Sequence, residues 1–191
     1  MRKTTLLFCL LWAIGLSAQT TVRDLLKSMP DSIIPYLTEN NRLDMVDFIE
    51  SNMDAVVTNA LGGKSQMLKL TDQYVSIQLS ESSSIAMRLL DVPTPVDSLP
   101  QILCLVHTYD SGIRESTVTF YSLAWRPLST TDYFSQPDYM FSATLGDEEP
   151  SITLRQESRL DAMGEEEKEE KKDIKEILTI LKWDGCFVKE N

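Results

Sequence analysis

The spacing of apolar residues changes once along this chain, near Asp54, and this change decides which elements can form. Before Asp54, apolar side chains recur every three or four residues, as they do on one face of an α-helix. After it, they alternate with polar side chains, as on a strand with one buried face. The sequence therefore predicts helices first and strands afterwards, without the strand-helix-strand alternation that builds a parallel sheet.

The helical part, residues 22–53, is interrupted by proline. A first helical run begins at Val22 and ends at Pro30, because proline lacks the N–H that a helix interior needs. A clearer helix is expected after a cap at Asn40 or Asn41. Its apolar residues keep helical spacing: Leu43, Val46, Ile49 and Met53.

The later part of the chain predicts six to nine strands. Runs that favour strands lie at residues 55–60, 66–70, 74–79, 85–90, 102–109, 116–123, 151–156, 177–183 and 186–189. The run at 102–109 is apolar on both faces, which predicts a central strand. One face carries Leu103, Leu105 and His107, and the other carries Ile102, Cys104 and Val106.

Together these patterns predict an α+β fold, in which amino-terminal helices pack on one or two twisted, mostly antiparallel β-sheets. The length indicates a single domain over residues 19–191, since a chain of this size buries enough surface for its own core. Two of the three cysteines, Cys104 and Cys186, lie within residues 19–191 and allow at most one disulfide there. Either a bonded pair or two buried free thiols fits the sequence.

Residues 1–18 have the features of a secretory signal peptide. Arg2 and Lys3 precede an apolar run over 6–16, which ends at small residues before the expected cleavage after Ala18. That run is too short to cross a bilayer, which needs about 20 residues. Cys9 lies inside it instead of after it, so a lipid anchor is not expected. The prediction is a soluble exported protein of the periplasm, cell surface or medium.

The formal net charge of −11 limits the partners. Loss of Arg2 and Lys3 with the leader makes the charge more negative still. Such a chain repels phosphate backbones and anionic lipid surfaces, so neither nucleic acid nor a membrane is an expected partner. No second long apolar segment follows that could insert into a bilayer.

Four segments carry a family resemblance: residues 29–37 (MPDSIIPYL), 40–45 (NNRLDM), 57–59 (VTN) and 74–80 (YVSIQLS). In these segments the chain resembles an exported Bacteroidales family, domain of unknown function 3256. The resemblance implies a Gram-negative source and a periplasmic or cell-surface location. It implies no activity, because the family has no assigned catalytic, cofactor or metal residues.

Two motifs resemble parts of ligand-binding or catalytic sites, but the residues around them do not fit such a site. A phosphate-binding loop ending in Gly-Gly-Lys-Ser at residues 62–65 would need a glycine where Thr58 stands, so a hairpin turn is expected instead. His107 is the only histidine, and Cys104 falls on the opposite face of the same strand. We therefore expect a structural histidine, and no catalytic, cofactor or metal residues.

Acidic residues are the remaining side chains in this sequence that could act in catalysis. One set recurs along the second helix: Asp44, Asp47, Glu50 and Asp54. Its expected role is a solvated helix face, with a calcium ion or a basic partner as the alternative. The charged run at residues 165–176 is expected to be a solvated helix or a disordered loop.

Residues 126–150 are expected to form a long loop with at most one short strand. Five aromatic residues in and beside this loop form the candidate binding surface: Trp125, Tyr133, Phe134, Tyr139 and Phe141. The alternative, which we favour, is a satellite core that pins the loop to the sheet. The expected function is a non-catalytic module that binds an envelope protein, peptide or glycan. A carboxylate-dependent, glycan-directed hydrolase is the alternative.

Overall fold

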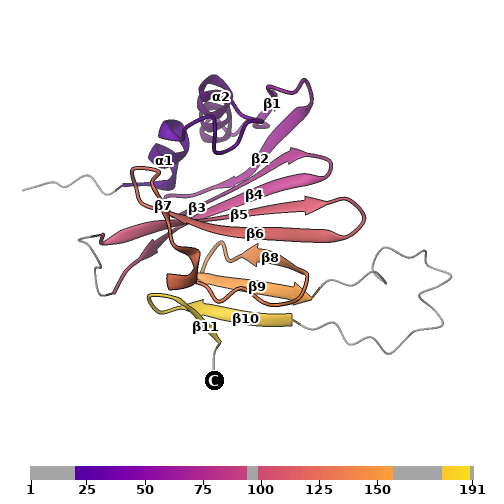
Figure 1. Ribbon diagram of the computed structural model, residues 1–191. Coiled ribbons are helices and arrows are strands. Elements are labelled where there is room, and N and C mark those ends of the chain that lie inside the picture. Colours follow the sequence, from indigo (N-terminus) through magenta and orange to yellow (C-terminus); the bar gives the residue numbers. More distant parts are fainter. Residues whose placement is uncertain (1–19, 94–98, 157–177, 190–191) are drawn as a thin grey trace, which may run out of the picture.

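The computed structural model describes residues 20–93, 99–156 and 178–189. Figure 1 shows three layers: two helices, a seven-stranded sheet and a four-stranded sheet. The predicted signal peptide and the charged run at 165–176 lie outside the described residues.

Both helices begin at a threonine that caps them. α1 (Val22–Ser28) starts after Thr21 and α2 (Glu39–Glu50) starts after Thr38. The prediction of a cap at Asn40 or Asn41 is wrong. Asn41 instead lies three residues inside the helix, where its side chain bonds back to the Thr38 N–H in a capping box.

The larger sheet is an antiparallel meander in which strand order follows the chain, β1-β2-β3-β4-β5-β6-β7. Its strands are β1 (Val56–Thr58), β2 (Lys64–Leu70), β3 (Tyr74–Ser80), β4 (Ser83–Asp91), β5 (Gln101–Asp110), β6 (Arg114–Tyr121) and β7 (Pro127–Leu128). The β1–β2 and β5–β6 turns contain Gly62 and Gly112, at φ of 84° and 98°. Glycine adopts this left-handed conformation without steric cost, which explains the turns.

The smaller sheet has the order β11-β10-β9-β8 and is also antiparallel. Its strands are β8 (Phe141–Leu145), β9 (Ser151–Gln156), β10 (Leu178–Trp183) and β11 (Phe187–Lys189). A short 3-10 helix, η1 (Thr130–Asp132), lies between β7 and β8.

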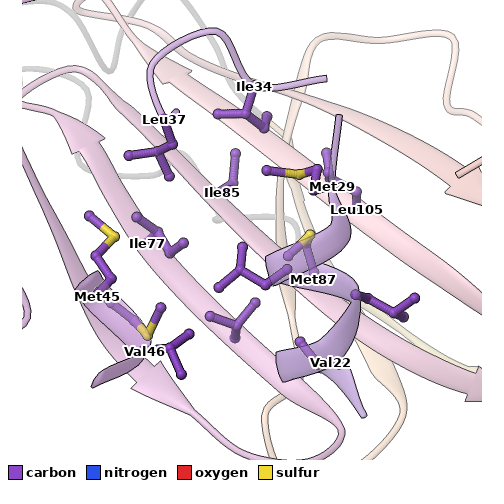
Figure 2. Close-up of a cluster of buried hydrophobic side chains, with 14 of the residues drawn as sticks. Val22, Met29, Ile34, Leu37, Met45, Val46, Ile77, Ile85, Met87 and Leu105 are labelled. Atoms are coloured by element: carbon purple, nitrogen blue, oxygen red, sulfur yellow. The ribbon is translucent and has the colours of Figure 1, made fainter. Parts of the chain in front are cut away.

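Strand β5 lies between two cores, as its apolar faces predicted. Leu103 and Leu105 belong to the core shared with the helices. Ile102, Cys104 and Val106 belong to the core between the two sheets. Figure 2 shows residues of the helices and of the turn between them packed over the helix-side face of the larger sheet: Val22, Met29, Ile34, Leu37, Met45 and Val46.

The predicted α+β class is wrong, because the described chain is mainly β. It contains eleven strands, whereas its two α-helices span only 7 and 12 residues. Prolines at 30 and 35 confine the segment between the helices to turns. In addition, the expected loop at 126–150 supplies both β7 and β8, and β8 completes a second sheet.

Cys104 and Cys186, the two cysteines among the described residues, are both free thiols. Cys104 is fully buried between the sheets, and burial raises the pKa of its thiol. Cys186 is partly exposed beside the β10–β11 turn. Of the two alternatives, the structure therefore has unpaired thiols, although only one of them is buried.

Candidate binding cleft

The five predicted aromatic residues do not form one surface. Trp125, Phe134 and Phe141 are 8%, 2% and 4% exposed, and Tyr133 and Tyr139 are half-buried. Trp125 lies on the helix side, where its indole N–H donates to the Leu25 carbonyl at 3.2 Å. The other four pack in or against the core between the sheets.

Ring contacts hold this segment against the sheet. The centroids of Tyr133 and Phe120 lie 5.2 Å apart, and those of Phe134 and Phe141 lie 6.2 Å apart. The favoured alternative, a packed satellite core, therefore describes the segment better than an open binding loop does.

His107 has a partner on each ring nitrogen. Ser83 Oγ lies 2.8 Å from Nε2, and the Tyr109 hydroxyl lies 2.9 Å from Nδ1. Burial lowers the pKa of His107, which favours the neutral ring. Ser83 is only 3% exposed, so a substrate cannot reach its hydroxyl without local opening. Sequence reasoning missed Ser83, because strand pairing alone brings it to the histidine.

The other candidates also take structural positions. The acidic helix residues are exposed, and Glu50 pairs with Arg23 at 2.5 Å. Within the described ranges, no group of three His, Cys, Asp or Glu residues could hold a metal ion. Residues 62–65 form a turn and the start of β2, with no helix to receive a phosphate.

A cleft of about 380 Å³ opens between strands β3, β4 and β5 of the larger sheet and strand β8 of the smaller one. This size is near the lower end of ligand sites, which span roughly 300–1,000 Å³. In Figure 1, β8 lies on the side of the larger sheet that is turned away from the helices.

The floor of the cleft is the second face of the larger sheet. Alternation along β3 sends Val75, Ile77 and Leu79 into the helix-side core, which leaves Ser76 and Gln78 on the cleft side. The neighbouring strands add small or hydroxyl-bearing side chains: Ser84, Ala86, Val106 and Thr108. The alternating polar residues of β3 indicated a strand with one polar face. The sequence did not show that strand β8 lies opposite this face.

One wall of the cleft is strand β8, whose residues 142–145 all line it. β8 is the last strand of its sheet and pairs only with β9, so alternate main-chain groups point away from the ladder. One of these groups, the Ala143 N–H, donates to Ser116 Oγ at 2.9 Å. That hydroxyl also lies 2.7 Å from Thr108 Oγ1, at the edge of the floor.

Charged residues stand at the hairpin end of the cleft. Glu81 is exposed in the β3–β4 turn and has no ion-pair partner among the residues that the structure describes. Asp110 pairs with Arg114 at 3.1 Å across the β5–β6 turn.

The other end is bordered by the loop after Leu145. Arg88 Nη1 donates to the Gly146 carbonyl at 2.8 Å, and Nη2 donates to the Glu148 carbonyl at 2.9 Å. Lys69 pairs with Asp147, which lowers the pKa of that carboxyl and raises the pKa of the lysine. The loop is therefore held in place over the larger sheet.

Comparison with known proteins supports the fold. A family model described as "Protein of unknown function (DUF3256)" matches residues 13–181. The chain is also similar to the solved structure of a domain of an uncharacterized protein from Porphyromonas gingivalis W83. The TM-score is 0.72 and the sequence identity 21%, over 88% of this chain and 97% of that one. No curated protein gives a significant match.

Proposed function

The chain belongs to the protein family of unknown function DUF3256, as its four segments predicted, and we propose that it is a non-catalytic binding module. Its site is the cleft between the larger sheet and β8, and its ligand is a peptide or glycan. We also propose, from residues 1–18, that it acts outside the cytoplasm.

The chemistry of the cleft carries this proposal. Residues with hydroxyl or amide groups, from four strands, line one hollow: Ser76, Gln78, Ser84, Thr108 and Thr144. Such groups donate and accept hydrogen bonds without a fixed charge, which suits sugar hydroxyls and peptide amides. In the described part of the chain, no helix is long and apolar enough to cross a membrane.

Nothing in the cleft favours the hydrolase alternative. Such an enzyme needs two facing carboxyl groups, one of them kept protonated by an apolar setting. Glu81 and Asp110 are both exposed, and Asp110 faces Arg114. Neither carboxyl therefore has the buried environment that a general acid requires.

Blocking the cleft tests the proposal. Purified protein is applied to arrays of synthetic peptides and of purified oligosaccharides, together with Ser84→Trp, which fills the floor, and Thr117→Trp as the control. Thr117 is exposed and pairs with His107, so it lies on the other face of the sheet. We expect Ser84→Trp to lose binding and Thr117→Trp to keep it.

A second blocking variant guards against misfolding. Thr144→Tyr places a ring at an exposed position of the wall and leaves both cores intact. Thermal melts show whether each variant folds. A ligand that binds all three folded variants equally, or no binding on either array, would overturn the proposed function.

A further inference from the structure

Resting on the proposed function, we propose that the ligand is an extended peptide segment that carries basic side chains. Three properties of the cleft favour this ligand over a glycan: its lack of a stacking ring, its main-chain wall and the charge at its two ends.

Sugar rings commonly rest on the face of an exposed aromatic side chain. Tyr74 is the one aromatic residue among the described residues that line the cleft, and it is only 7% exposed. Burial raises the pKa of its phenol, in keeping with a ring packed into the floor. The cleft therefore offers hydrogen bonds but no platform for a sugar ring.

The wall provides partners suited to a peptide backbone. β8 spans five residues and carries neither charge nor proline, the usual protections of an edge strand. The other edge strands, β1, β7 and β11, are only two or three residues long. A short extended peptide can hydrogen-bond to the floor hydroxyls and to outward main-chain groups of the wall other than the Ala143 N–H, which donates to Ser116.

The charges at the two ends of the cleft favour a peptide with basic side chains. At the hairpin end, Glu81 and Asp110 outnumber Arg114. The loop at the other end carries three carboxylates, Asp147, Glu148 and Glu149, against two cations: Lys69, which pairs with Asp147, and Arg88, which bonds to the carbonyls of the loop. Both ends therefore have an excess of carboxylates, and the net charge of −11 steers cationic ligands toward the protein.

Fluorescence anisotropy with defined probes tests the inference. The probes are three labelled eight-residue peptides in which threonine alternates with lysine, glutamine or glutamate, together with chitohexaose as a competitor. We expect the lysine peptide to bind about tenfold or more tightly than the glutamate peptide, with an advantage that shrinks at high salt. Ser84→Trp should abolish the binding.

Charge variants locate the contact. Glu81→Gln should weaken the lysine peptide by about two- to fivefold, as expected for an exposed ion pair. Glu115→Gln is the control, because Glu115 is exposed and pairs with Tyr109 on the other face of the sheet. Equal losses in both variants would mean that only the net charge matters, which would overturn the inference.

A separate probe tests whether the cleft recognises the backbone of the peptide. Methylation of alternate amide nitrogens of the lysine peptide removes donors without changing its charge, and we expect at least a tenfold loss of affinity. Unchanged affinity would overturn the extended pairing. If chitohexaose binds, Ser84→Trp blocks it and the peptides do not bind, the proposed function stands and this inference fails. If no probe or array ligand binds, both fail.

Discussion

Arg42 shows how one buried charge organises the turn between the helices. The side chain is 1% exposed, and its guanidinium donates to three carbonyls and one carboxylate. The acceptors are Leu26 O at 2.9 Å, Leu37 O at 2.6 Å, Asp31 Oδ1 at 2.7 Å, and Met29 O. Arg42 therefore satisfies the Met29 and Leu37 carbonyls of the turn, and it adds a second donor to the Leu26 carbonyl, which also accepts from the Met29 N–H at 3.4 Å.

Removing this side chain should be costly. Arg42→Ala leaves buried carbonyls unpaired, and we expect a loss of about 3–5 kcal/mol in the free energy of unfolding, measured by urea titration. Arg42→Lys should recover only part of this loss, because one ammonium cannot reach all the acceptors. The exposed Arg126→Ala serves as the control, expected within about 0.5 kcal/mol of the wild type. Equal stability of the Arg42 and Arg126 variants would contradict this role.

His107 predicts a loss of stability in acid. Burial lowers the pKa of His107 below its ordinary value of 6.5 in the folded protein. Between the two values the unfolded chain binds more protons, so stability falls as the pH drops below about 6.5. We expect the urea midpoint to fall less between pH 7 and pH 5 in His107→Gln than in the wild type. Equal falls would show that the histidine contributes nothing.

At the scale of elements, turn residues and strand periodicity proved the most predictable features. All nine predicted strand runs overlap observed strands, because alternation and glycine turns are local signals. Helix caps were harder to place. Thr38 and Asn41 act as a reciprocal pair, whereas the residue type alone favours a cap at Asn40 or Asn41 as much as at Thr38.

Residues 126–150 contribute two strands, β7 and β8, where at most one short strand is expected from the sequence. The aromatic residues of this segment point inward, which only the second sheet makes favourable. We expect Phe134→Ala to cost about 3–5 kcal/mol, because the ring is 2% exposed. The matched control is Met140→Ala in the same segment, where the side chain is 47% exposed and the expected cost is below about 0.5 kcal/mol.

Thermal melts distinguish these outcomes. For a domain of this size, 1 kcal/mol corresponds to a Tm change of roughly 2–4 °C. Phe134→Ala should therefore lower Tm by at least about 6 °C. A Tm decrease no larger than that of Met140→Ala would contradict the buried packing of Phe134. The segment would then again be a candidate for an open binding surface.

At the scale of the whole molecule, the predicted signal peptide at residues 1–18 makes export a testable expectation. When the full chain is expressed in a Gram-negative host, we expect the exported product to begin at Gln19, because the small residues Ser17 and Ala18 follow the apolar run. Mass spectrometry of the intact protein measures this directly. Retained Met1 or a lipid adduct would contradict the prediction.

By itself, the sequence determined the local elements and the central strand. The period of apolar residues, the prolines and the turn glycines act over a few residues, so they can be read without the fold. The two apolar faces of β5 likewise required two cores, and both are present.

Only the tertiary structure decided the class of fold, the partners of His107 and the cleft. Ser83 meets His107 across two paired strands, and residues 142–145 of the smaller sheet border the same cleft as Ser76 and Thr108. Such contacts depend on pairing and packing between residues far apart in the chain, which local periodicity does not specify. From the sequence alone, a polar strand face cannot be distinguished from ordinary solvent-exposed surface. Here the second sheet lies opposite that face, and only its position shows that the polar residues line a cleft.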